Sequence, residues 1–215
     1  MASQPKSTRE RLLDAGLKLA RRAGLRALTV RRVCDAVHAN TGTFFYHFGT
    51  RDAFVAELIE RWYAPLMAGL TATVDSDAPP LQRLRGLLAQ LTGWAAANSR
   101  FITTLAVDAA AGERAAQSFL RSIAGRHPPL ILRVLGEGQQ AGLLRAADPV
   151  HQMMFLMSAL ALPIVLTDRI SASGLGPREL TGRLQRLARD PAAIEERLDW
   201  ALAGLTKERP DATLR

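Results

Sequence analysis

The sequence predicts an all-α protein, with a small head of three helices at the N-terminus and a larger helical domain after it. Apolar residues recur at intervals of three and four along most of the 215 residues, and Gly or Pro separates many of these stretches. No stretch shows the apolar and polar alternation of a half-buried strand. The chain has 215 residues, of which 48% are hydrophobic, so it can bury a hydrophobic core.

The first predicted helix begins after Ser7. The spacing Ser7-x-x-Glu10 is typical of a capping box, in which both side chains accept hydrogen bonds from backbone N–H groups at the helix start. Gly24 is placed to end this helix. Its apolar residues repeat at helical spacing: Leu12, Leu13, Leu17 and Ala20.

Two short helices follow, each with its own cap. Thr29 is suited to cap the first of them, and Asn40 to cap a third helix over about Thr41–Phe48. His38-Ala39-Asn40 interrupts the apolar pattern between the two. The apolar face of the earlier helix consists of Val30, Val33, Cys34 and Val37.

The third helix concentrates aromatic rings, with Phe, Phe, Tyr, His and Phe at positions 44–48. At 100° per residue, Phe44 and Phe48 fall on one face and should anchor the helix, since so short a helix needs tertiary packing. On the opposite face lie Gly42, Thr43 and Tyr46, while Phe45 and His47 lie at the edges of the face formed by Phe44 and Phe48. The helix is therefore predicted to display polar and aromatic groups.

Positive charge is concentrated in the same region. Residues 1–52 contain ten Lys/Arg and four Asp/Glu, which leaves +6 of the chain's formal net charge of +8. Such a field suits a polyanion such as nucleic acid or an anionic membrane, and a solvated basic face is the alternative. Two short helices joined by a tight turn beside a basic surface predict a helix-turn-helix, whose second helix enters the DNA major groove.

A longer fourth helix and further helices should follow. Thr50 can cap the fourth, with Asp52 in its first turn and an apolar stripe from Phe54 to Trp62. The segment Ser171–Asp190 is interpreted as a loop, SASGLGP, followed by a short helix, ELTGRLQRL. The remaining predicted helices are Leu81–Asn98, Arg100–Ala111, Ala115–Arg126, Pro129–Ala141, Pro149–Ile170 and Pro191–Leu205.

On these residues, the segment 7–62 resembles the DNA-binding domain of the tetracycline-repressor-like (TetR) family of bacterial regulators. The resemblance is carried by STRERLLDAGLKLARRAGLRALTVRRV and by TGTFFYHFGTRDAF. It implies a DNA-binding domain over residues 6–66, with the motif at 29–48, and a helical effector-binding and dimerisation domain over 67–215. About a quarter of the chain carries the resemblance.

The resemblance also implies which residues lie at DNA. Arg51 would reach a phosphate from the start of the fourth helix, and Arg31 and Arg32 would add charge. Three positions depart from the family pattern: His38 stands where Gly is usual, Thr41 where Lys is frequent, and Phe45 where Tyr is frequent. The expected DNA-binding residues are Thr29, Arg31, Arg32, Asn40, Thr41, Gly42, Thr43, Phe45, Tyr46, His47 and Arg51.

By the same resemblance, the protein would be a ligand-responsive repressor that binds a palindromic operator in double-stranded DNA as a homodimer. The last two long helices would pair with their symmetry mates, with Trp200 and Leu198 as interface residues or else core. An unknown small-molecule effector would bind the C-terminal domain. The candidate effector-binding residues, which are equally candidates for core, are Trp94, Phe101, Phe119, Met153, Met154 and Met157.

Other classes of function find little support. Cys34 lies on an apolar stripe, the histidines lack metal-ligand spacing, and no Gly-rich phosphate loop occurs, so we expect no enzyme, metal site or cofactor.

The apolar run 153–166 is shorter than the roughly 20 residues of a membrane helix and is interpreted as a buried helix. Without a secretory signal, a cytoplasmic protein is expected. Alternative functions are a small-molecule-binding or sequestering helical protein, or a nonspecific architectural DNA binder, with an altered head.

Overall fold

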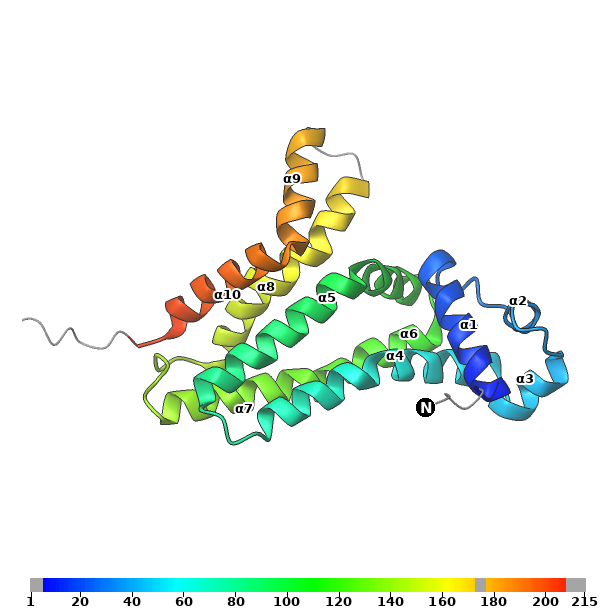
Figure 1. Cartoon of the computed structure of the whole chain (residues 1–215), viewed down its shortest axis with the longest axis horizontal. Helices are drawn as coiled ribbons and strands as arrows, with labels where there is room; N and C mark the ends of the chain where they lie inside the picture. The colour runs from blue at the N-terminus through cyan, green and yellow to red at the C-terminus, as the bar shows by residue number, and fades with distance from the viewer. Residues whose placement is uncertain (1–5, 173–176, 208–215) are drawn as a thin grey trace, which may run out of the picture. The chain divides into compact units, whose positions relative to one another are not determined.

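The computed structural model describes residues 6–172 and 177–207. In these ranges the protein is all-α, with helices α1 to α10 and one short 3₁₀ helix, η1, and no β-strand (Figure 1). The predicted fold class is confirmed.

The helices form two compact units that do not follow the chain order. Unit 1 consists of the described residues up to Pro65 together with Arg100–Ile123. Unit 2 consists of Leu66–Ser99 and the described residues from Ala124 onward. The head is thus packed with a later segment, 100–123, which the sequence assigned to the second domain.

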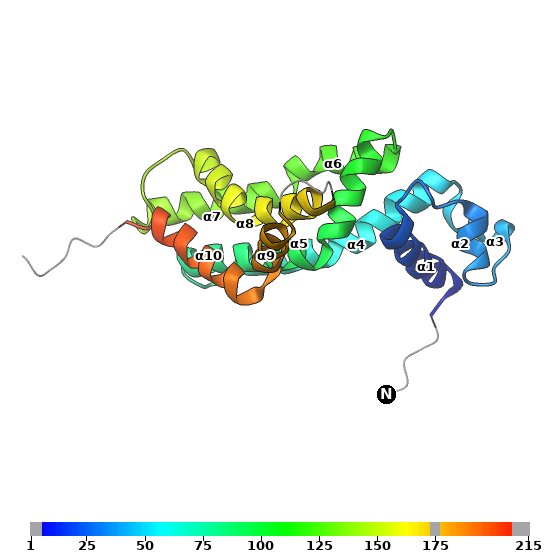
Figure 2. The same cartoon turned by 90° about the horizontal axis from the view of Figure 1, so that it is seen from above.

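Helices α1, Thr8–Ala23, and α3, Thr41–Phe48, have the expected bounds (Figure 2). Helix α2 begins after Thr29 as expected but spans only Val30–Asp35, so Val37 of the expected apolar face lies in the turn after it. The capping box at the start of α1 is complete, because the Ser7 side chain accepts from the Glu10 backbone and the Glu10 side chain accepts from the Ser7 backbone. Gly24 ends α1 with φ +84°, a backbone conformation that favours glycine.

Helix α4 spans Arg51–Val74 and contains Pro65. Its first half packs tightly on α1, where Gly16 leaves the room: a Cβ atom built on Gly16 would lie 2.5 Å from the Phe54 ring. Only a glycine permits this approach of the two helices. Phe54, Val55, Leu58 and Ile59 of α4 are all buried in unit 1.

Helix α5 differs from the prediction. Two helices were expected, Leu81–Asn98 and Arg100–Ala111, but α5 is one helix over Pro80–Ala110. Neither Gly nor Pro stands near Ser99 to end the first part, so the helix continues through it. After it come α6, Arg114–Ser122, and η1, Ile123–Gly125.

Unit 2 contains the C-terminal helices α7, His127–Gln140, α8, Pro149–Ala172, α9, Arg178–Arg189, and α10, Pro191–Leu205. Helix α8 contacts α7, α9 and α10, and both views show α9 beside α8 (Figures 1 and 2). The predicted short helix after residue 177 is confirmed. The expected SASGLGP loop begins too early, because Ser171 and Ala172 still belong to α8, and its residues 173–176 lie outside the described residues.

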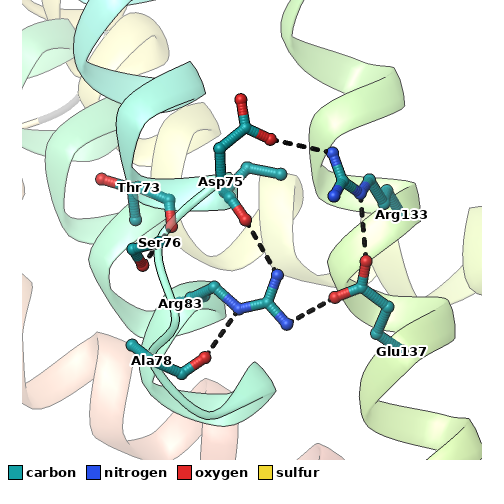
Figure 3. A network of polar contacts seen from close by, with 8 residues as sticks. Thr73, Asp75, Ser76, Ala78, Arg83, Arg133 and Glu137 are labelled. Atoms are coloured by element: carbon teal, nitrogen blue, oxygen red, sulfur yellow. Dashed lines mark hydrogen bonds and ion pairs between the residues drawn. The ribbon is translucent and has the colours of Figure 1, made fainter.

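A polar network fixes the turn between α4 and α5 to α7 within unit 2 (Figure 3). Arg83 donates to the backbone carbonyls of Val74 and Ala78, each at 2.8 Å, and to the Glu137 carboxylate at 2.5 Å. Arg133 bridges Glu137 and Asp75, at 3.0 Å each. Burial opposes ionisation of Glu137, but its two arginine partners leave the pKa of this carboxyl below its ordinary value.

Helix α8 corrects the expectation of a buried helix. Leu156, Leu160 and Ile164 are buried, but Met154 and Leu162 are exposed in the single chain. The stretch Pro149–Thr167 has the length and composition to cross a membrane, and 28% of its most apolar window is buried. A core or interface helix of a soluble protein has the same composition, so this stretch alone is weak evidence for a span. Because α8 has apolar residues on all of its faces, its sequence does not indicate which face packs against the rest of the chain.

Candidate nucleic-acid interface

Helix α2 begins at a side-chain cap and carries exposed arginines. The Thr29 hydroxyl accepts from the Arg32 backbone N–H at 3.2 Å, so the helix starts where the sequence predicted. Arg31 is 90% exposed and lies 3.9 Å from Asp35, a distance and exposure at which an ion pair holds the side chain weakly. Both Arg31 and Arg32 are therefore available to a ligand from solvent.

The turn between α2 and α3 is held by backbone hydrogen bonds and by one unusual residue. The Ala39 N–H donates to the Cys34 carbonyl at 3.0 Å, and the Cys34 thiol donates to the Asn40 carbonyl at 3.7 Å. Burial, and secondarily the charge of Asp35, raise the pKa of Cys34, which agrees with its packing role. His38 has φ +55°, the left-handed conformation in which glycine would be relaxed.

Asn40 caps the candidate recognition helix α3. Its side-chain oxygen accepts from the Thr43 backbone N–H at 2.7 Å and from the Thr43 hydroxyl at 2.9 Å. A Cβ at Gly42 would meet only that same oxygen, at 3.3 Å, so Gly42 keeps the first turn open to approach by a partner. Thr41 and Gly42 are exposed beside it.

Two rings fasten α3 to the rest of unit 1. Phe44 and Phe48 are buried, and their ring centroids lie 5.0 and 4.9 Å from that of Phe54 on α4. The Arg9 guanidinium lies over the Phe48 ring at 5.4 Å, which covers its outer side with a cation–π contact. The predicted inward face of the helix is confirmed.

The opposite face of α3 is displayed to solvent. Tyr46 is 86% exposed, Phe45 is exposed, and His47 is half-buried with its ring 5.2 Å from that of Tyr46. The face thus offers a phenol hydroxyl, an imidazole and the hydroxyl of Thr43. These groups can donate to and accept from base edges or phosphates.

Arg51 has a different environment from the rest of the predicted interface. Its guanidinium donates to the carbonyls of Leu25 and Leu28, each at 2.7 Å, and pairs with Glu113 at 2.9 Å. Burial favours a lower pKa for Arg51, but the hydrogen bond and charge of Glu113, with Asp52, leave the pKa raised. Most of its donors are used inside unit 1, which favours a structural role in place of the expected phosphate contact.

Two acidic residues that the sequence analysis did not predict hold Arg51 and the loop between α1 and α2 in place. Glu113 and Asp108 are both buried, and Asp108 accepts from the buried Leu25 N–H at 2.6 Å. They stand at the end of α5 and the start of α6, 62 residues from Arg51 and 83 from Leu25. Nothing in the local pattern marks them, since their partners lie so far away along the chain.

The candidate effector residues divide between the two units. Phe101 and Phe119 belong to unit 1, where Phe101 lies 4.7 Å from the Trp62 ring and Phe119 lies 5.1 Å from the Tyr63 ring. All four of these aromatic side chains are buried.

The other candidates belong to unit 2. Trp94, Met153 and Met157 are half-buried there, and Met154 is exposed. Met157 lines a shallow groove of about 280 Å³ on α8 with Ser158, Ala161, Leu162 and Val165. The assignment of the six residues to an effector site stays a prediction.

Comparison with known proteins agrees with this geometry. Residues 12–58, which run from α1 into α4, match the family of bacterial regulatory proteins called the tetR family. Over these residues, the chain is similar to the TetR family. Among the described residues, the helix-turn-helix of this family is therefore α2 and α3, with α1 and the start of α4 around it.

Two curated repressors match this chain over different shares of its length. The HTH-type transcriptional repressor KstR2 of Mycobacterium tuberculosis is 37% identical over 87 residues, which are 40% of this chain and 44% of the relative. The match thus spans less than half of the relative's length. HTH-type transcriptional repressor NicS of Pseudomonas putida is 24% identical over 67% of this chain and 69% of its own length.

Two solved structures share the fold over nearly the whole chain. The structure of the ketosteroid transcriptional regulator KstR2 of M. tuberculosis has a TM-score of 0.65 at 23% identity, covering 96% of this chain and 99% of its own. The complex of SmeT with triclosan has a TM-score of 0.70 at 19% identity, covering 98% of each chain; SmeT is the repressor of a multidrug efflux pump of Stenotrophomonas maltophilia.

Proposed function

We propose that the protein is a transcriptional repressor that binds a palindromic operator as a homodimer and responds to a small molecule. One observation carries the DNA-binding part: the short helix α3 is anchored by Phe44 and Phe48 and displays Tyr46, His47 and Thr43 on its opposite face. The +6 charge of residues 1–52 supports approach to DNA. The family match is to regulatory proteins, which supports the same role.

The proposed contacts divide into two kinds. Thr43, Tyr46 and His47 would read base edges in the major groove, with Gly42 allowing the backbone to come close. Thr29, Arg31, Arg32, Asn40, Thr41 and Phe45 would position the head against the backbone and the groove walls. Arg51 would act from inside the unit by holding the end of the α1–α2 loop.

The homodimer is proposed from the outer faces of α8 and α10. Met154 and Phe155 of α8 and Trp200 of α10 are exposed, and Trp200 is 63% exposed. The two helices contact each other, and a Cβ at Gly204 of α10 would lie 3.8 Å from the Phe155 ring. An exposed apolar surface of this kind is typical of an interface between subunits. Leu198, the other candidate from the sequence, is buried and belongs to the core.

An effector is proposed because a protein of this fold has been solved with a small molecule bound. SmeT has been solved with triclosan, and KstR2 is described as a ketosteroid regulator. In unit 1, the side chains of Trp62, Tyr63, Phe101 and Phe119 form a buried aromatic cluster, and aromatic side chains of this kind predominate around bound apolar ligands. We therefore propose an apolar small molecule as the class of effector.

The proposal is tested first by selection from random duplex DNA with the purified protein at near-physiological salt. Enrichment of a palindrome with half-sites one or two helical turns apart is the expected result, since a two-fold dimer places two recognition helices at that spacing. Enrichment of no sequence, with affinity that falls steeply with salt, would instead support an architectural DNA binder.

Variants of α3 then separate reading of DNA from folding. Tyr46→Ala should weaken operator binding and leave the melting temperature unchanged, because the side chain is exposed. Phe44→Ala should cost about 3–5 kcal/mol of stability by opening the core of unit 1. If Tyr46→Ala melts the unit or binds the operator as tightly as the wild type, the proposed reading face is wrong.

A further inference from the structure

A groove in unit 1 lies outside the recognition helix and is not used by the proposed contacts. It has a volume of about 450 Å³ and runs between one face of α1 and the residues that follow α2. Helix α1 contributes Arg11, Lys18 and Arg22 to its lining, and the chain after α2 contributes Ala36–His38. Helices α1 and α2 are in contact, so the groove belongs to a single packed unit.

The three cations lie on one stripe of α1. They are separated by seven and four residues, which places them along one helix face. Lys18 and Arg22 are exposed, and neither makes an ion pair within the part of the chain that the structure describes. Their charges are therefore available to an anion from solvent.

The acidic residue in the groove is already neutralised. The Asp14 carboxylate pairs with Lys6 at 2.7 Å and with Arg61 at 2.9 Å. Both of these partners come from outside the groove lining, so Asp14 does not compete for Lys18 or Arg22. The groove keeps a positive field although it contains a carboxylate.

Two groups in the groove are held in place by the backbone. The Arg11 guanidinium donates to the Val37 carbonyl at 2.6 Å, which ties α1 to the turn and leaves the other guanidinium donors for a ligand. His38 keeps a left-handed backbone at φ +55°, a conformation that costs free energy for a residue with a Cβ. The imidazole is thereby placed at the rim of the groove.

We propose that this groove binds a phosphate group, with Arg11, Lys18 and Arg22 as its cationic ligands and His38 at its edge. Lys18 and Arg22 lie one helical turn apart, so both can donate to the oxygens of one phosphate, and arginine can bind two of these oxygens at once. The phosphate comes either from the DNA backbone, in which case the inference rests on the proposed DNA-binding function, or from a free phosphorylated small molecule. In the first case the groove adds backbone contacts beyond those of α2 and α3.

The test compares the double variant Lys18→Ala/Arg22→Ala with the wild type. Both side chains are exposed, so the fold should be unaffected, which circular dichroism checks. The matched control is Arg178→Ala/Arg183→Ala on α9, which removes the same charge from exposed positions of unit 2. Two measurements are made: the salt dependence of binding to duplex DNA, and titration of the protein with pyrophosphate followed by NMR of the His38 amide.

If the DNA backbone supplies the phosphate, the slope of log K against log salt should fall by about 2 in the groove variant, since each lost phosphate contact removes about 0.9. The control should keep the wild-type slope. If a free phosphate is bound, pyrophosphate should shift the His38 amide in the wild type and in the control but not in the groove variant, with the DNA slope unchanged.

The proposal is overturned if the groove variant keeps the slope of the control and pyrophosphate leaves the His38 amide unmoved. That failure is distinct from failure of the repressor proposal. The slope can be measured on any duplex, and the pyrophosphate titration needs no DNA. If the wild type selects no operator, the repressor proposal fails, whereas phosphate binding in the groove is still decided by the salt slope and the pyrophosphate titration.

Discussion

The guanidinium of Arg51, at the first residue of α4, lies 2.9 Å from the carboxylate of Glu113, just before α6. The same guanidinium donates to the carbonyls of Leu25 and Leu28 in the loop between α1 and α2. One side chain therefore connects three segments of unit 1. The helix-turn-helix is completed by residues that the chain supplies more than 60 positions later.

Glu113→Ala should destabilise unit 1 by about 1–3 kcal/mol, because it removes the buried carboxylate partner of Arg51 and leaves the guanidinium only the exposed Asp52 as an ion-pair partner. Urea denaturation followed by circular dichroism measures the loss. Arg31→Ala is the matched control, since its pair with Asp35 is 3.9 Å long and exposed on both sides, and it should change stability by less than about 0.5 kcal/mol. If the two variants lower the free energy of unfolding equally, the pair of Arg51 with Glu113 stabilises the unit no more than an exposed surface pair.

Asp108→Ala should have a comparable effect for a different reason. The Leu25 N–H is buried and bonds to the Asp108 carboxylate at 2.6 Å, so removal of the acceptor leaves that N–H unpaired, at a cost of about 1–3 kcal/mol. Hydrogen exchange of the Leu25 amide should accelerate strongly. Asp108→Asn keeps an acceptor oxygen and should lose less. Slow exchange at Leu25 in both variants would contradict this account.

These two acids also show where sequence reasoning ends. Ser7 with Glu10, and Asn40 with Thr43, interact over three residues, so the residue pattern alone located those helix starts. Asp108 was hidden because its partner lies 83 residues away, and nothing in its neighbourhood distinguishes it from a solvated acid. Local sequence patterns thus predicted where the recognition helix begins and which face is buried, but not the distant acidic residues that hold the loop before α2.

Helices α5 and α8 were misread for related reasons. A division of α5 near Ser99 was expected, although the sequence there offers no helix-breaking residue. In α8 the apolar residues occupy every face, so no periodicity could separate buried Leu160 from exposed Met154. The distinction depends on tertiary packing, which a one-chain sequence pattern does not contain.

His127, the first residue of α7, should make stability depend on pH. Burial lowers its pKa to about 4, below the ordinary value of 6.5 that the unfolded chain retains. The unfolded state therefore binds the proton more strongly, so stability is complete above about pH 6.5 and falls as the pH drops toward 4. We expect a loss of about 1–2 kcal/mol between pH 7.5 and pH 5.

Urea denaturation across this range measures the dependence, with His127→Gln as the test variant. The variant should flatten the curve, because it cannot take up the proton. His151→Gln is the control, since that imidazole is exposed, and it should keep the wild-type slope. A slope unchanged by His127→Gln would assign the pH dependence to other groups.

Met154→Arg and Trp200→Arg should each dissociate the proposed dimer. Both side chains are more than half exposed in the single chain, so an arginine is tolerated by the monomer, whereas the closed α8–α10 face would have to bury two unpaired charges. Sedimentation velocity should show the monomer, and operator affinity should fall because the two heads no longer bind together. Val107→Arg, at an exposed apolar residue of α5, is the control and should remain dimeric. Dimers that persist in both variants would place the interface on another surface.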